Sequence, residues 1–168
     1  MAVSVPTLAL ADLYGGKICA ALDRQHPRDL FDVKLLLDEG GIDEPTRKAF
    51  VVYLASHNRP MSELLDPLRK DVGAAYESEF AGMVRASATY DDLAEAREAL
   101  IEAIRVGLTA SEREFLVSIK AAEPRWELMD LPGIEALPAI QWKLANTEKT
   151  SSDKRRTAYE RLQRVLEQ

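Results

Sequence analysis

Residues 13–37 read LYGGKICAALDRQHPRDLFDVKLLL, and this stretch decides the fold because it describes two helices and the turn between them. Apolar residues recur at helical spacing on both sides of the turn, which predicts helices over about Leu10–Asp23 and Arg28–Glu39. Only residues 24–27 separate them, and Pro27 suits the first turn of the second helix. So short a connection predicts that the two helices are antiparallel neighbours.

Three charged residues of this hairpin lie where the pattern calls for apolar ones. On a helical wheel, Lys17 falls in the same arc as Leu10 and Leu13, the face that is expected to meet the core. Asp29 and Asp32 share one face of a second helix that is apolar around most of its circumference. An unpaired buried charge is costly, so these groups are expected to reach solvent, to form ion pairs or to serve a functional site.

The short turn is expected to bring five polar residues, Lys17, Arg24, Arg28, Asp29 and Asp32, toward one end of the hairpin. Such a group can cradle a triphosphate and orient a hydroxyl nucleophile. The same five residues can also form an internal network of ion pairs. The residues alone leave both interpretations open.

Two glycines precede the lysine inside the first predicted helix. Each of Gly15 and Gly16 costs a helix about 1 kcal/mol relative to alanine. A close approach of another helix, or of a ligand, would account for them, and helix packing is the commoner cause. Cys19 has no base near it in sequence, so we do not expect it to act as a nucleophile.

Most of the remaining sequence also has helical spacing, which predicts a mainly α fold resembling a helical bundle. The opening segment VSVPTLAL can form a short strand, limited to an edge or an end by Pro6. Thr109 and Glu112 form a capping box at the start of one helix. After the hairpin, helices are expected over Glu44–Ser56, Met61–Lys70, Ala74–Met83, Tyr90–Val106, Ala110–Ala121, Ile134–Lys149 and Ser152–Leu166.

The composition narrows the class of protein. The 168 residues carry a formal charge of −6, which argues against a protein that coats nucleic acid through its general field. A local basic groove stays open, because residues 148–168 hold six Lys or Arg against four acids. That tail is expected to be a solvated helix face, with an RNA-contacting patch as the alternative. A single cysteine and the lack of a long apolar run predict a soluble, cytoplasmic protein.

With these residues in view, the stretch 13–37 resembles the signature of the AbiEii/AbiGii toxin family of nucleotidyltransferase-like proteins. In that signature a lysine lies in a helix that reads roughly l-Y-x-x-K-l-x-A-l, followed by an arginine and then by R-D-l-x-D-l. The residues that match are Lys17, Arg24, Arg28, Asp29 and Asp32. Beyond position 37 the similarity is only that of a helical continuation.

The resemblance implies a nucleotidyltransferase core of the polymerase-β type followed by a helical domain. It implies catalytic roles for Lys17, Asp29 and Asp32, and contacts of Lys17, Arg24 and Arg28 with the nucleotide. It also implies Mg²⁺ and a nucleoside triphosphate in the intact family enzyme, with transfer of nucleotides to RNA such as tRNA. Family members are toxins of toxin–antitoxin or phage-defence (abortive infection) pairs, which implies an antitoxin protein as partner.

One part of the family pattern is missing. The metal-binding half of the family carries a Gly-Ser turn and an Asp-x-Asp pair, and neither occurs in these 168 residues. Carboxylates that hold Mg²⁺ supply the main charge stabilisation in phosphoryl transfer. We therefore expect a C-terminal part of such a toxin, without a metal site, that is incomplete without its N-terminal half. The alternative is a non-catalytic helical module that docks an antitoxin or RNA.

The expected organisation follows from this comparison. Residues 1–9 are expected to be a short strand or linker from the nucleotidyltransferase core. Residues 10–123 are expected to form the helical domain that carries the lysine and aspartate motif. Residues 124–168 are expected to be a connector followed by a C-terminal pair of helices.

Overall fold

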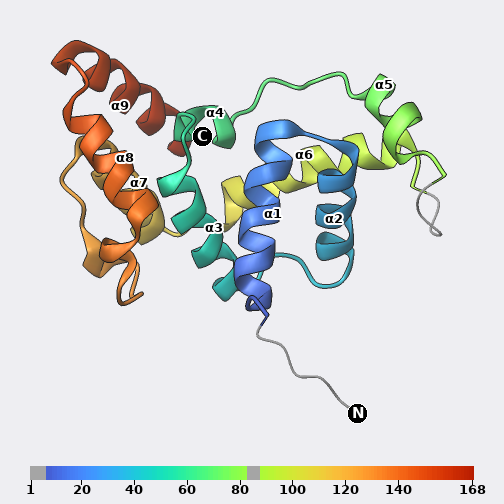
Figure 1. Ribbon diagram of the computed structural model, residues 1–168, viewed down its shortest axis with the longest axis horizontal. Coiled ribbons are helices and arrows are strands. Elements are labelled where there is room, and N and C mark those ends of the chain that lie inside the picture. Colours follow the sequence, from blue (N-terminus) through green and yellow to red (C-terminus); the bar gives the residue numbers. More distant parts are fainter. Residues whose placement is uncertain (1–6, 83–87) are drawn as a thin grey trace.

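The computed structural model of the protein describes residues 7–82 and 88–168, and within these ranges it is helical without any strand (Figure 1). This confirms the prediction of a mainly α fold. The α-helices are α1 Leu10–Arg24, α2 Pro27–Asp38, α3 Glu44–Ser56, α4 Met61–Leu65, α5 Gly73–Ala75, α6 Tyr90–Gly107, α7 Ala110–Ala121, α8 Pro138–Glu148 and α9 Ser152–Leu166. Shorter turns are the π-helix η1 Tyr76–Phe80 and the 3-10 helices η2 Trp126–Leu128 and η3 Ile134–Ala136.

Helix α1 packs on α3 through a contact that only glycine permits. A Cβ atom added at Gly15 would lie 2.8 Å from the Cβ atom of Ala49 and 2.9 Å from the backbone nitrogen of Phe50. Real Cβ atoms do not come so close to backbone, so the two helices meet at the surface of Gly15 itself. The neighbouring Gly16 has more room, since its nearest atoms belong to the Tyr53 ring at 3.7 Å. Close helix packing therefore explains Gly15.

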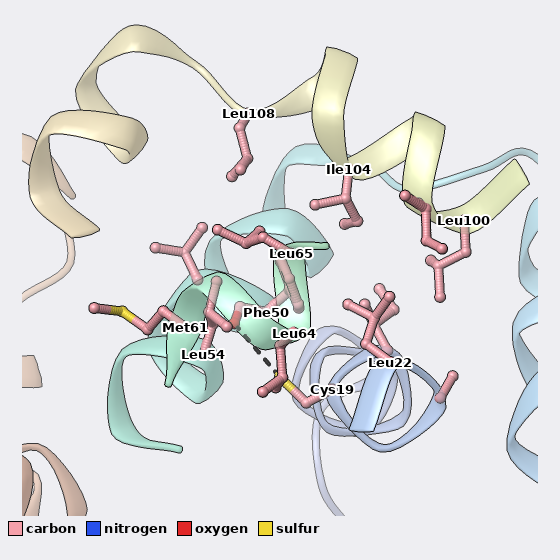
Figure 2. Close-up of a cluster of buried hydrophobic side chains, with 14 of the residues drawn as sticks. Cys19, Leu22, Phe50, Leu54, Met61, Leu64, Leu65, Leu100, Ile104 and Leu108 are labelled. Carbon is pink, nitrogen blue, oxygen red and sulfur yellow. Dashed lines mark hydrogen bonds between the residues drawn. The ribbon is translucent and has the colours of Figure 1, made fainter. Parts of the chain in front are cut away.

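One part of the core lies between α1, α3, α4 and α6 (Figure 2), and the same cluster continues into α2, α7, α8 and α9. Helix α1 contributes Leu22 and Cys19, whose thiol points to the backbone oxygen of Phe50 at 4.0 Å. Burial and the nearby carboxylate of Asp23 raise the pKa of the Cys19 thiol to about 12, so it stays protonated and unreactive. The other labelled side chains of this cluster are Phe50, Leu54, Met61, Leu64, Leu65, Leu100, Ile104 and Leu108.

Helices α7, α8 and α9 lie together on one side of the molecule (Figure 1). Helix α7 begins with the predicted capping box, in which Thr109 and Glu112 satisfy each other's backbone amides. The Glu112 side chain is buried and also accepts from the Arg47 guanidinium of α3, with both oxygens 3.0 Å from Nε. One carboxylate thus caps a helix and fastens the α7–α9 group to α3.

Several predicted helices are confirmed and two are wrong. Glu44–Ser56, Ala110–Ala121 and Ser152–Leu166 have the predicted bounds. The helix predicted over Met61–Lys70 ends at Leu65, because proline at position 67 disfavours helical backbone at the residue before it. The helix predicted over Ile134–Lys149 is split into η3 and α8 for the same reason, by proline at position 138.

The ends of two other predictions fall outside the described residues. Of the strand or linker predicted over residues 1–9, only 7–9 are described, and they have no regular structure. Of the helix predicted over Ala74–Met83, the described part is α5 followed by the π-helix η1. Within residues 7–82 and 88–168, no helix combines the length and the apolar character that crossing a membrane requires.

The two glycines of α1 are expected to respond to alanine with opposite signs. Gly15→Ala should lower the free energy of unfolding by about 1–2 kcal/mol, because overpacking against α3 outweighs the gain of about 1 kcal/mol in helix propensity. Gly16→Ala should be neutral or raise it by up to about 1 kcal/mol. Urea denaturation of both variants measures this, and a stabilised Gly15→Ala variant would contradict the close packing.

Candidate functional site

The hairpin of α1 and α2 is set by its two-residue turn. Gln25, the residue that follows α1, has left-handed backbone (φ 54°), and His26 caps α2 by accepting from the Arg28 amide at 3.2 Å. Pro27 occupies the first turn of α2, where its missing amide costs no hydrogen bond. The predicted antiparallel arrangement of the two helices is confirmed, and Figure 1 shows them side by side.

Two ion pairs connect the helices of the hairpin. The Lys17 ammonium is 2.5 Å from a carboxylate oxygen of Asp32, and both side chains are about a third exposed. Nearer the turn, the Arg24 guanidinium is 2.9 Å from Oδ1 of Asp29. Arg24 is 64% exposed, whereas the Asp29 side chain is only 8% exposed. Lys17, Asp32 and Arg24 can therefore be reached by a ligand.

The second oxygen of Asp29 is unusual. Among the described residues, Asp29 Oδ2 is the buried side-chain atom that has no hydrogen-bond partner. An unsatisfied buried carboxylate oxygen costs free energy, so its retention needs an explanation. The position of Asp29 in the first turn of α2 offers a partial one, because the helix dipole favours negative charge there.

The five polar residues predicted to gather at one end of the hairpin are divided among three contacts. Lys17 and Arg24 are seven residues apart on α1, which is about 10.5 Å along the helix axis. On α2, however, Asp29 and Asp32 are only three residues apart, or about 4.5 Å, so the two ion pairs follow one another along the hairpin. Arg28 is directed to a third place, where its guanidinium donates to the backbone oxygen of Glu79 in η1 at 3.1 Å.

The face on which Lys17 lies also differs from the prediction. Leu10 and Leu13, expected to face the core, are 72% and 42% exposed. The buried face of α1 is instead formed by Gly15, Ile18, Cys19, Ala21 and Leu22. Because small residues allow α3 to pack closely, the core meets α1 on the glycine side rather than on the leucine side. Lys17 lies beside the core, on the accessible surface.

Exposed leucines border the Lys17–Asp32 pair. Leu13 precedes Lys17 by one helical turn, and Leu35 follows Asp32 by one turn on α2, where it is 38% exposed. Leu10 extends the same face of α1 by another turn. We call Leu10, Leu13 and Leu35 the leucine surface. Contiguous exposed apolar residues on a protein surface commonly mark an interaction site.

The described residues do not fit a Mg²⁺ site. No group of three or more His, Cys, Asp or Glu residues suited to a metal ion occurs in residues 7–82 and 88–168. Asp29 and Asp32 are each engaged by a cation, Arg24 and Lys17 respectively. Mg²⁺ requires several oxygen ligands in close to octahedral geometry. The hairpin can supply cations and one accessible carboxylate for a nucleotide, but it cannot hold the metal by itself.

Gln25 was not identified from the sequence, although it organises the turn. The side chain is buried, and its Nε2 donates to the backbone oxygen of Leu68 at 2.8 Å. Its Oε1 accepts from the Lys70 amide at 2.9 Å and from the Arg97 guanidinium at 3.3 Å. Gln25 thus fastens the turn to the extended segment 66–72 and to α6. A polar residue between a helix end and His-Pro was the available signal, but its partners are remote in sequence.

A comparison with protein families gives one match. The family model described as "Nucleotidyl transferase AbiEii toxin, Type IV TA system" matches residues 1–146. This range includes the whole hairpin and both ion pairs, whereas α9 lies outside it. Neither the curated proteins nor the solved structures include a match to the chain.

The stabilities of two hairpin variants separate a functional ion pair from a structural contact. Lys17→Met is expected to change the free energy of unfolding by less than about 1 kcal/mol, because its ion pair with Asp32 is solvent-accessible. Gln25→Ala is expected to lower it by about 1–2 kcal/mol, because two backbone groups lose their partner. Chemical denaturation measures both. A loss of about 3 kcal/mol in Lys17→Met would indicate that the pair is structural.

Proposed function

The chain belongs to the AbiEii nucleotidyl transferase toxin family of type IV toxin–antitoxin systems, and on that premise we propose that it is the helical part of a toxin that transfers nucleotides to RNA. The expected acceptor is tRNA, and the transferred group comes from a nucleoside triphosphate. The proposed partner proteins are an antitoxin and a nucleotidyltransferase half that supplies the metal-binding residues. The observation that carries the proposal is the accessible Lys17–Asp32 pair within the matched residues.

Lys17 is proposed to hold the phosphates of the nucleotide. An ammonium that is paired with a carboxylate at a partly exposed position can exchange that partner for a phosphate oxygen at little cost. Asp32 would then be released next to the reacting groups. A carboxylate within reach of an RNA hydroxyl can accept its proton as the hydroxyl attacks the α-phosphorus of the nucleoside triphosphate and pyrophosphate leaves.

Arg24 and Asp29 are proposed to form the second contact with the nucleotide. Asp29 is buried and binds one side of the exposed Arg24 guanidinium, so it fixes the direction of that side chain. Guanidinium has five donors, and those not used by Asp29 stay free for phosphate oxygens. In this assignment Asp29 positions Arg24, and Arg28 contributes charge at the entrance of the turn.

The leucine surface supports the proposal of a further protein domain over the hairpin. Leu10, Leu13 and Leu35 are exposed next to the Lys17–Asp32 pair, where apolar side chains gain most from being covered. A nucleotidyltransferase half seated there would bring its Mg²⁺ ligands to the lysine and would exclude water from the reaction. The site would then be shared between two parts of the toxin.

The second candidate is a non-catalytic binding module that docks an antitoxin or RNA. It is favoured by one observation, namely that the sequence has no Gly-Ser turn and no Asp-x-Asp pair. Under this alternative the ion pairs of the hairpin are remnants of the family's active site, and only the surface of the helical domain has a function.

The purified chain is expected to transfer no nucleotide to RNA. The reason is that its hairpin lacks the carboxylates needed to hold Mg²⁺ near Lys17. The test incubates the chain with labelled nucleoside triphosphates, Mg²⁺ or Mn²⁺, and total tRNA. A family nucleotidyltransferase half with Gly-Ser and Asp-x-Asp is then added in trans. Labelling by the chain alone that survives repurification would contradict the proposal of a shared site.

In a fusion of this chain behind such a half, Lys17→Met, Asp29→Asn and Asp32→Asn should each abolish toxicity with little change in melting temperature. The matched control is Lys34→Met, which removes an equally short lysine–carboxylate pair on another face of α2, 2.6 Å from Asp38. The control should stay toxic. Growth assays and thermal melts are measured together. Retained toxicity in all three variants would refute the assignment of the active site.

A further inference from the structure

Charge is distributed unevenly along the chain. Residues 138–168, which include α8 and α9, carry seven Lys or Arg against four Asp or Glu, whereas residues 1–137 carry 15 against 24. The protein is acidic as a whole, so this basic end is a local feature. A basic surface on an acidic protein attracts anions at that surface alone.

Many of the cations in α7, α8 and α9 also lack acidic partners. In the other helices, ion pairs are common: Lys34 pairs with Asp38, Lys48 with Glu44 and Arg105 with Glu102. Among the described residues, no carboxylate lies within ion-pair distance of Lys120, Lys143, Lys149, Lys154, Arg155 or Arg164. These charges are therefore not neutralised within the described protein.

Two of these cations line one shallow groove, and two further cations lie on the side of α9 that forms its wall. Lys120 of α7 and Lys143 of α8 line it, and Ala158 and Leu162 of α9 form its other wall. Lys154 precedes Ala158 by four residues, and residue 161 follows it by three, so both lie on the same side of α9 as Ala158. At the rim, the Arg161 guanidinium is 3.8 Å from Glu63, which it shares with Arg59.

The two lysines that line the groove repel each other and have no carboxylate partner among the described residues. Burial and the nearby Lys120 lower the pKa of the Lys143 ammonium to about 8, and burial also lowers the pKa of Lys120. Lys143 donates to the backbone oxygens of His57 at 2.5 Å and Arg59 at 3.0 Å, which fixes it in place. A bound anion would relieve the repulsion between the two ammonium groups.

The spacing of the cations indicates a polyanion rather than a single phosphate. Lys154 and Arg161 are seven residues apart on α9, or about 10.5 Å along its axis, which is more than one phosphate can bridge. Next to Lys143 in sequence, the Trp142 side chain is 58% exposed on α8. Exposed aromatic rings together with cations bind single-stranded nucleic acid, because the rings stack on bases and the cations contact phosphates.

We infer that α7, α8 and α9 form a binding surface for the phosphodiester backbone of RNA, in which Lys120, Lys154 and Arg161 contact phosphates and Trp142 stacks on a base. The choice of RNA over other polyanions rests on the proposed function. The surface would hold the acceptor RNA at a distance from the Lys17–Asp32 pair. Lys120 and Trp142 lie within the family match, which ends at residue 146, whereas Lys154 and Arg161 lie beyond it.

The test measures binding of the 168-residue chain to a labelled oligouridylate and to unfractionated tRNA by fluorescence anisotropy. The variant Lys120→Gln/Lys154→Gln/Arg161→Gln should weaken binding at least tenfold. Lys143 is left unchanged because it supports the turn between α3 and α4. The matched control Lys34→Gln/Lys48→Gln/Arg105→Gln removes the same charge from α2, α3 and α6, and should bind like the unchanged protein.

Salt dependence and Trp142 separate the two kinds of contact. Removing one cation that binds a phosphate should reduce the slope of log K against log salt by about 0.7, so the triple variant should have a shallower slope by about 2. Trp142→Ala should weaken binding of oligouridylate by about tenfold without changing the slope, because stacking releases no counterions. Circular dichroism and melting temperature check that every variant is folded.

Three results would overturn the inference: no RNA binding by the folded chain at low salt, equal weakening by both triple variants, or equally tight binding of polyglutamate or anionic phospholipid vesicles. The last would reassign the surface to an acidic protein or to a membrane. If the chain binds RNA but transfers no nucleotide after the nucleotidyltransferase half is added, the RNA-binding surface is supported and the proposed function is refuted. If the triple variant transfers nucleotides as well as the unchanged protein does, the RNA-binding surface is refuted and the proposed function is supported.

Discussion

The close approach of α1 to α3 at Gly15 is the constraint on which the position of the hairpin depends. With no Cβ at this position, the backbones of the two helices touch, and the rotation of α1 about its own axis is fixed. Ile18 and Leu22 then face the core, and Lys17 is turned to the accessible side, where α2 places Asp32 beside it. A larger residue at position 15 would move every side chain of α1, including the lysine.

The two ion pairs of the hairpin differ in what holds them. Lys17 and Asp32 are equally exposed and depend on each other, so a ligand can separate them. Asp29 is buried and pairs with the exposed Arg24 through one oxygen. Its second oxygen has no hydrogen-bond donor among the described residues. An unsatisfied buried oxygen lowers stability, and a functional role is one explanation for keeping it. In the proposed function, a nucleotidyltransferase half covers the leucine surface beside the first pair.

Local signals predicted most of the fold, and contacts remote in sequence explain what they missed. Capping residues gave α3 and α7 their bounds, because such signals act within one turn. Helix α9, which has no side-chain cap, was predicted from its apolar spacing. The motif of Lys17, Asp29 and Asp32 could be identified by resemblance, and its catalytic roles stay predictions. The helical wheel predicted that Leu10 and Leu13 face the core because it assigns the large apolar side chains to the buried face. In the structure, α3 packs against Gly15 instead. The partners of Gln25 lie more than 40 residues away, beyond any local pattern.

The dependence of the turn on Gln25 has a consequence at the level of the gene. Its carboxamide must donate to one backbone group and accept from another at the same time, from a left-handed position. No single-nucleotide change of a glutamine codon produces another carboxamide. A point mutation that changes this residue therefore replaces the amide with a charged side chain, an apolar side chain, a ring or a stop codon. No single-nucleotide step leads to a residue that could make the same two hydrogen bonds. Position 25 should evolve slowly although it takes no part in the chemistry.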